Sequence, residues 1–319
     1  MKSPPKSRLP PKANGQSITV TAPARVGILG NPSDGYGGRT LSLAVPEFSA
    51  TVELEASDRL EIVATEADLP IWSDVADLVD RVDRHGYGTG PQLLAATVRT
   101  FADVAASLQH PGVSRLGFRL SYGTTIPRQV GLGGSSALVV ATLKALCQLT
   151  ELEVPDEVLP SVALRVETEQ LGITAGLQDR VVQSYGGLVA MNFGDMATDT
   201  RFGVSHGEYR SHEVENLPSL FLAYRELAAE PSDGYHRTLR RRYDAGDAGV
   251  RETLRALAAL VVEGEAALRW GNTERFGELI AENMRLRKCL DPSQRPSWHW
   301  WMPRRRSTFL PPSPDPVAR

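Results

Sequence analysis

Short hydrophobic runs dominate the first third of the chain. Between residues 18 and 64, β-branched or alternating apolar positions are interrupted by glycine, proline and aspartate. This pattern is typical of strands separated by turns. It predicts a strand-rich layer made of the runs ITVTAPARVGILG, TLSLAV, TVELEA and RLEIVA, which begin at Ile18, Thr40, Thr51 and Arg59.

The pattern then changes to helical spacing over residues 90–109, where Leu94, Val98, Phe101 and Leu108 fall on one face. A strand is predicted next, from the alternation in LGFRLSY, followed by a glycine-rich stretch that leads directly into a helical pattern. Further along, the spacing predicts helices near 161–171 and 176–184 and a strand in GLVAMNF. Strands and helices mix without a strict βαβα order, which favours an α+β fold over a doubly wound sheet.

The pattern also suggests how the chain is divided. A second unit is predicted from residue 217, with a strand in SLFLAYREL and helices over 237–243, 248–270 and 273–288. We expect a disordered tail at 1–17, rich in proline, lysine and serine, a first domain at 18–216, a second at 217–290 and an atypical tail at 291–319.

Composition narrows the class of function. The chain has 319 residues, of which 41% are hydrophobic, and a formal net charge of -3. A chain of this size builds substantial cores, and its charge provides no broad field for nucleic acid or a membrane surface. Its two cysteines, Cys147 and Cys289, are too few for a disulfide framework. We expect a cytoplasmic protein whose partner is a small molecule, with its oligomeric state left open.

The glycine-rich stretch PRQVGLGGSSA, residues 127–137, is the first candidate for chemistry. Glycines let the backbone approach a ligand closely, and the helix that follows presents unpaired N–H groups suited to an anion. The lysine of a Walker loop is missing, and Lys144 lies about 13 Å further along a helix. The alternative is a glycine-rich turn that only caps a core helix.

Three stretches, in order, resemble the signature motifs of the GHMP small-molecule kinases. They are APARVGILGNPSDGYGG, PRQVGLGGSSA and ETEQLGITAGLQDR, within residues 22–180. Within that family, GNPSDGYGG and AGLQDRVVQSYGGL are most similar to the sugar kinases that use ATP to phosphorylate glucuronate at its anomeric hydroxyl. The resemblance implies two domains, a first domain like ribosomal protein S5 and a second, ferredoxin-like domain that is truncated here.

The resemblance also implies catalytic and nucleotide-binding roles. Asp179 corresponds to the catalytic carboxylate, and Arg25 corresponds to a basic residue that would stabilise it by charge pairing. Mg²⁺ would be held by Ser135 and Glu167, with Glu169 as a rival. The ATP phosphates would lie on Gly131, Leu132, Gly133, Gly134, Ser135 and Ser136. The alternatives are a helix-capping aspartate, a surface ion pair and a solvated helix face.

The substrate would meet the first and third motifs. Asp34 is the expected partner of sugar hydroxyls, with Asn31, Tyr36 and Tyr185 as further contacts, although Asn31 and Asp34 also suit a plain turn. A uronic acid carboxylate requires a cation, for which the candidates are Arg128, Arg180 and Arg39. For adenine the sequence suggests Trp72 and Ser73, with a core position as the alternative for Trp72.

The last segment departs from the family. After residue 290 the chain reads PSQRPSWHWWMPRRRSTFLPPSPDPVAR, in which the glycine-rich third motif of the family is absent and neither strand nor helix spacing is visible. It has the composition of a foreign or frameshifted end, a divergent tail being the alternative. We therefore expect a second domain that lacks the strands which the third motif would supply. A kinase for galactose or another sugar, or a binding protein without turnover, remain alternative functions.

Overall fold

The computed structural model describes residues 17–63, 71–88, 91–213, 217–224, 233–290 and 298–301. The predicted disordered tail therefore lies outside the described residues except for Ser17. The same holds for most of the atypical C-terminal tail. The predicted α+β class is confirmed, because one large sheet and a set of separate helices make up the described chain.

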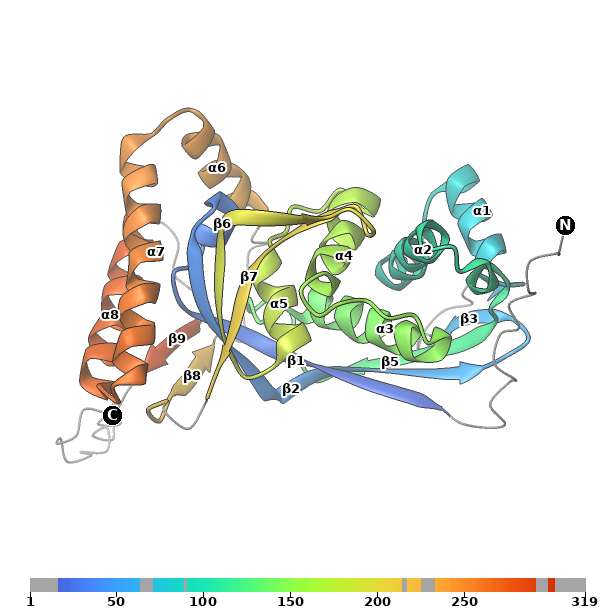
Figure 1. Cartoon of the computed structure of the whole chain (residues 1–319), viewed down its shortest axis with the longest axis horizontal. Helices are drawn as coiled ribbons and strands as arrows, with labels where there is room; N and C mark the ends of the chain where they lie inside the picture. Colours follow the sequence, from blue (N-terminus) through green and yellow to red (C-terminus); the bar gives the residue numbers. More distant parts are fainter. Residues whose placement is uncertain are drawn as a thin grey trace, which may run out of the picture.

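One sheet of seven strands organises the first two thirds of the chain (Figure 1). Its long central strand is β2, which pairs along one edge with β1 and along the other with β5 and β6. The pair β3–β5 is parallel and the other pairs are antiparallel. The strands are β1 (Ile18–Leu29), β2 (Arg39–Ala56), β3 (Leu60–Val63), β4 (Ile71–Trp72), β5 (Phe118–Thr124), β6 (Leu188–Asp199) and β7 (Val204–His212).

The two runs predicted as separate strands, TLSLAV and TVELEA, are parts of the single strand β2. The interruption between them contains Pro46, which has no N–H for a sheet hydrogen bond. Pairing with β1 shifts register at this point, since Pro23 lies opposite Ser49 but Ala24 lies opposite Val45. Strand β2 can continue through Pro46 because the register shift with β1 occurs there, so no backbone hydrogen bond from residue 46 is needed.

Helices cover one face of this sheet and one of its ends. α3 and α5 pack on β1 and β2, with α2 and α4 against α3. The α-helices are α1 (Val75–His85), α2 (Gln92–Ser107), α3 (Gly134–Thr150), α4 (Leu159–Arg165), α5 (Leu177–Tyr185), α6 (Asp233–Asp244), α7 (Ala248–Arg269) and α8 (Thr273–Leu290). Short 3₁₀ turns form η1 (Ser33–Tyr36) and η2 (Pro111–Arg115), and a π-helical turn forms η3 (Val166–Gln170). No helix among the described residues combines the length and apolarity that crossing a membrane requires.

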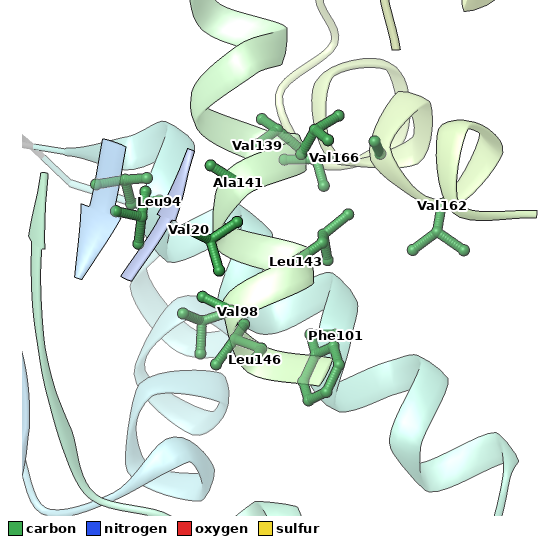
Figure 2. Packing of buried hydrophobic residues seen from close by; sticks show 14 of the residues in the cluster. Val20, Leu94, Val98, Phe101, Val139, Ala141, Leu143, Leu146, Val162 and Val166 are labelled. Carbon is green, nitrogen blue, oxygen red and sulfur yellow. The ribbon is translucent and has the colours of Figure 1, made fainter. Parts of the chain in front are cut away.

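The main core lies between the sheet and helices α2 to α4 (Figure 2). Phe101 from α2, Leu143 from α3 and Val162 from α4 are buried there together with Val20 of β1. The helical face predicted over 90–109 supplies Leu94, Val98 and Phe101 to this core. This packing holds the start of α3 and the whole of β1 in fixed positions, and both carry candidate site residues.

A second hydrophobic cluster joins the two predicted domains. Ile28, Leu29 and Leu41 of the large sheet pack there against Val261 of α7 and Phe276 of α8. The two helices lie side by side next to the end of β1 and the beginning of β2 (Figure 1). The C-terminal helices thus share a core with the strands on either side of η1.

Several elements differ from the sequence-based prediction. Helix α1 and strand β7 are not among the predicted elements, although Val75 and Leu78 of α1 are buried. The strand predicted in SLFLAYREL is confirmed as β8 (Phe221–Tyr224), and it pairs antiparallel with β9 (Trp298–Trp301), which the sequence did not predict. Strand β9 lies in the C-terminal segment, whose sequence shows neither strand nor helix spacing. It is a strand because it pairs with β8, which the local sequence pattern does not reveal.

Gly264 of α7 provides a test of the shared core. A Cβ at this position would overlap Cδ1 of Leu29, so we expect Gly264→Ala to destabilise the protein by about 1–3 kcal/mol through overpacking. Chemical denaturation measures this change. In the control Gly249→Ala on the same helix, the added Cβ meets Asp247 Oδ1 at an ordinary 3.5 Å, and stability should stay within about 1 kcal/mol. Equal stability of the two variants would contradict the packing described.

Candidate active site

The glycine-rich stretch forms the N-terminus of α3. Gly133 is the residue before the helix and has a left-handed φ of 75°, which glycine adopts readily. No side chain caps this helix end, so the first amides of a 17-residue helix stay available to a ligand. Their partial positive charge and their direction suit an anion such as a phosphate.

Asp179 lies in the first turn of α5 and is paired with Arg25 of β1. Arg25 Nε donates to Asp179 Oδ1 over 2.6 Å, and a second guanidinium nitrogen contacts the same oxygen. Both side chains are only partly buried. The predicted proximity of these two residues, which are 154 positions apart in sequence, is therefore observed.

The phosphate loop and the carboxylate share one location. A Cβ placed on Gly133 would lie 3.4 Å from Asp179 Oδ2. Arg25 also contacts the loop, since its Nη1 donates to Gly131 O over 3.1 Å and its backbone N–H donates to Leu132 O over 3.0 Å. The structure thus brings together the two predicted parts of a phosphoryl-transfer site.

Glu167 joins this group from the π-helical turn η3. Its Oε1 accepts a hydrogen bond from Ser135 Oγ over 3.0 Å, and its Oε2 forms an ion pair with Arg180. The side chains of Glu167 and Arg180 are 4% and 3% exposed, so this is a buried pair. The rival Glu169 is 55% exposed and pairs with Arg165 at 2.9 Å, which places it on the solvated face.

Arg180 is unsuited to bind the carboxylate of a substrate directly. Its Nη2 contacts Glu167 and its Nη1 donates to Gly176 O over 2.5 Å. Burial lowers the pKa of Arg180 to about 9, with repulsion from Arg25 adding to the shift and attraction from Asp34 opposing it. The guanidinium is therefore already engaged within the protein, contrary to the expectation of an open fork at this position.

The loop after β1 brings Asp34 and Asn31 to the same helix end. A Cβ on Gly176, the residue before α5, would lie 2.7 Å from Asp34 Oδ2. Asn31 lies beside Gln178, since a Cβ on Gly27 would lie within 3.1 Å of the side-chain amides of both. The buried Asn31 Oδ1 accepts no hydrogen bond from the described residues. Asp34 and Asn31 therefore lie near the N-terminal end of α5, the end that carries Asp179.

Other predicted contacts lie elsewhere. Tyr36 packs on Tyr243 of α6, with ring centroids 4.6 Å apart. Tyr185, at the opposite end of α5 from Asp179, packs on Tyr209 of β7 at 5.8 Å. Burial raises the pKa of Tyr185 to about 12. These aromatic side chains are therefore engaged in packing between elements.

The remaining candidate residues, and Lys144, lie in different parts of the structure. Arg39 lines a polar hollow on β6 and β7 with Glu208 and Glu265, to which neither α5 nor the phosphate loop contributes. Trp72 is buried in the main core, while the N–H of Ser73 donates to Asp77 over 2.9 Å. Arg128 is exposed and forms no ion pair with another described residue. Lys144 donates to Ser184 O over 2.7 Å, far from the loop.

Sequence reasoning missed two glutamines of the site and one arginine that contacts η1. Gln178 donates to Ser42 Oγ over 2.7 Å and Gln183 donates to Gly133 O over 2.7 Å, both from buried positions on α5. Arg240 of α6 lies over the ring of Tyr36 at 4.5 Å and donates to Gly35 O over 2.5 Å. The glutamines fall on the inner face of the predicted helix 176–184, which is a weak signal, and nothing in the sequence pairs Arg240 with η1.

The donor set for a metal ion is small. No cluster of three or more His, Cys, Asp or Glu side chains able to hold a metal occurs within the described ranges. Ser135 and Glu167 offer one hydroxyl and one carboxylate oxygen 3.0 Å apart. Mg²⁺ in nucleotide sites is commonly held by one or two side chains together with substrate phosphates and water. Ser135 and Glu167 fit this type of Mg²⁺ coordination.

Comparison with known proteins agrees with this geometry. Residues 92–187 match the family described as GHMP kinases N terminal domain. Glucuronokinase 1 of Arabidopsis thaliana is 38% identical over 270 residues, covering 83% of this chain and 72% of the relative. Probable glucuronokinase 2 of the same plant is 40% identical over 275 residues, covering 84% and 72%.

Among solved structures, the mevalonate kinase of Methanococcus jannaschii superposes with a TM-score of 0.64 at 19% identity, covering 88% of this chain and 82% of that one. This likeness concerns the fold, whereas the sequence matches extend across both the sheet and the C-terminal helices. The chain belongs to the GHMP kinase family.

Proposed function

We propose that this protein transfers the γ-phosphoryl group of ATP to the anomeric hydroxyl of a sugar, and that the sugar is glucuronate. The observation that supports the proposal most strongly is that the Asp179 carboxylate lies next to Gly133, at the start of α3. A Cβ atom built on Gly133 would be 3.4 Å from Asp179 Oδ2. An acid beside an anion-binding helix end is what phosphoryl transfer to a hydroxyl requires. The glucuronokinase relatives support glucuronate as acceptor.

The phosphates of ATP would bind at the loop from Gly131 to Ser136. The free amides at the start of α3 supply hydrogen-bond donors, and the helix dipole adds partial positive charge. Arg25, held at Gly131 O and at Asp179, provides a full positive charge next to the same place. These groups take the part that a lysine has in Walker loops.

Mg²⁺ would be held by Ser135 and Glu167. When bound, the ion would neutralise charge on the phosphate oxygens. Glu167 is held in place by Arg180, which also removes part of its negative charge. Such pairing leaves one oxygen, Oε1, facing the hydroxyl of Ser135. The buried pair thus fixes the orientation of the carboxylate that would meet the cation.

Direct in-line transfer fits the arrangement. The anomeric oxygen attacks the γ-phosphorus while its proton passes to a carboxylate oxygen of Asp179, and the bond from phosphorus to the bridging oxygen breaks to release ADP. Arg25 orients Asp179 through Oδ1, which leaves Oδ2 on the side of the phosphate loop. Asp34 and Asn31 lie where they can hold neighbouring sugar hydroxyls. Asp179 reaches the hydroxyl directly, so no phosphoenzyme is needed.

A uronate carboxylate requires a cation, and we assign Arg128 to this part. Of the three arginines that the sequence suggests, Arg180 is bound to Glu167, and Arg39 lines a hollow with Glu208 of β7 and Glu265 of α7. Arg128 lies three residues before Gly131 and has an exposed side chain without an ion pair to other described residues. An arginine can bind a carboxylate through two parallel hydrogen bonds.

A coupled assay of ADP release against a panel of sugars and uronic acids tests the activity itself. We expect MgATP-dependent turnover with glucuronate, and slower turnover with galactose and glucose because they lack the carboxylate. Turnover faster with galactose than with glucuronate would replace the proposed acceptor. Absence of turnover with every sugar, together with measurable ATP binding, would favour a binding protein over a kinase.

Asp179→Asn should lower kcat by about 10²–10⁴, because the amide cannot accept the proton of the attacking hydroxyl. Steady-state kinetics with saturating ATP and glucuronate measure this loss. The matched control is Asp195→Asn, an exposed position on β6 outside the site, which should retain wild-type kcat. A near wild-type kcat for Asp179→Asn would remove the proposed role of this carboxylate.

Arg128→Gln should reduce kcat/KM for glucuronate by about 10- to 100-fold, the range that corresponds to a hydrogen bond to a charged group. The kcat/KM for a neutral sugar should change less than threefold, since it has no carboxylate to bind. Arg39→Gln serves as the control, with glucuronate kinetics expected to be unaltered. An equal loss for charged and neutral sugars would show that Arg128 does not read the carboxylate.

A further inference from the structure

We infer that Gln183 is a positioning residue that holds the phosphate loop in its nucleotide-binding shape. This inference rests on the proposed function, since it assigns the loop to ATP. Gln183 lies on α5, four residues after Asp179, and its side chain is 2% exposed. Residues four apart lie on the same face of a helix, so Gln183 and Asp179 approach the loop together.

The contact of Gln183 is with the most constrained residue of the loop. Its Nε2 donates to Gly133 O over 2.7 Å. A Cβ on Gly133 would lie 2.8 Å from that same nitrogen, so the amide also occupies the space a side chain would need. Gly133 has a positive φ and immediately precedes the free amides of α3. Because its carbonyl shares a planar peptide group with the N–H of Gly134, the direction of the carbonyl fixes the direction of that amide.

Two side chains from outside the loop, Arg25 and Gln183, each donate a hydrogen bond to a loop carbonyl. Arg25 Nη1 donates to Gly131 O over 3.1 Å, and Gln183 Nε2 donates to Gly133 O. A carbonyl oxygen turned toward a phosphate would repel it, whereas successive N–H groups that converge on one point form an anion site. With both carbonyls engaged by the protein, the amides of Gly134 and Ser135 remain for the ligand.

A purely structural explanation of Gln183 is weak. Gly133 O already accepts hydrogen bonds from Ser136 Oγ over 3.0 Å and from the N–H of Ala137 over 3.1 Å. Meanwhile the buried Gln183 Oε1 accepts no hydrogen bond from the described residues. A buried polar atom without a partner lowers stability, and an apolar side chain of the same size would avoid this. Gln183 is thus expected to lower the stability of the folded protein while it holds the loop in its nucleotide-binding shape.

This reasoning leads to an experiment with Gln183→Met, which keeps the length of the side chain and removes its donor. Binding of MgATP is measured by titration calorimetry without sugar, so the result does not depend on which sugar is phosphorylated. We expect Kd for MgATP to rise about tenfold, as for loss of one hydrogen bond. KM for the sugar should stay within twofold, and the thermal unfolding midpoint should be equal to or above that of the wild type.

The control Gln148→Met lies on an exposed position near the other end of α3 and should leave both quantities unchanged. A lower unfolding midpoint with unaltered affinity for MgATP would overturn the inference, since it would make Gln183 a structural residue. If the wild type binds MgATP and Gln183→Met binds it equally well, the inference alone fails. If the wild type does not bind MgATP, the proposed function fails and the inference fails with it.

Discussion

The contacts made by Arg25 are the interaction on which the site depends. This residue of β1 holds the Asp179 carboxylate through its guanidinium, the Gly131 carbonyl through Nη1 and the Leu132 carbonyl through its backbone. The acid and the phosphate loop come from segments separated by more than forty positions in the chain. Because β1 is paired along its length with β2 and buried under α3, Arg25 is held by the core itself. In the proposed mechanism, one rigid strand would align the acceptor with the donor phosphate, which would reduce the entropic cost of bringing them together.

Around Arg25 the charges alternate. Asp179 lies next to Arg25, Glu167 next to Arg180, and Asp34 close enough to Arg180 to affect its pKa. Buried ion pairs contribute little net stability, but they fix direction because removing either partner leaves a buried charge. Several buried polar atoms without a partner among the described residues belong to this same group: Asn31 Oδ1, Arg180 Nε and Gln183 Oε1. Buried polar atoms without partners are rare in folded proteins, so the presence of three of them in this group is consistent with the proposed site.

The sequence was sufficient for the parts of the site carried by short motifs. Glycines before a helix are a local pattern that marks the loop, and the resemblance of three short motifs to the GHMP kinases selected Asp179, Arg25 and Glu167. The structure brings these residues together, and their catalytic roles stay predictions. The directions in which individual side chains point were harder to predict. Tyr36 points to α6 and Tyr185 to β7, because their partners Tyr243 and Tyr209 come from distant segments. The same limit explains Gln183, whose role is visible only once α5 and the loop are in contact.

The most direct measurement is a crystal structure of the protein with Mg²⁺, a non-hydrolysable ATP analogue and glucuronate. The account predicts the γ-phosphate at the amides of Gly134 and Ser135, with the anomeric oxygen of the sugar between it and Asp179 Oδ2. A nucleotide bound away from the start of α3, or a sugar whose anomeric oxygen lies beyond hydrogen-bonding reach of Asp179, would contradict it.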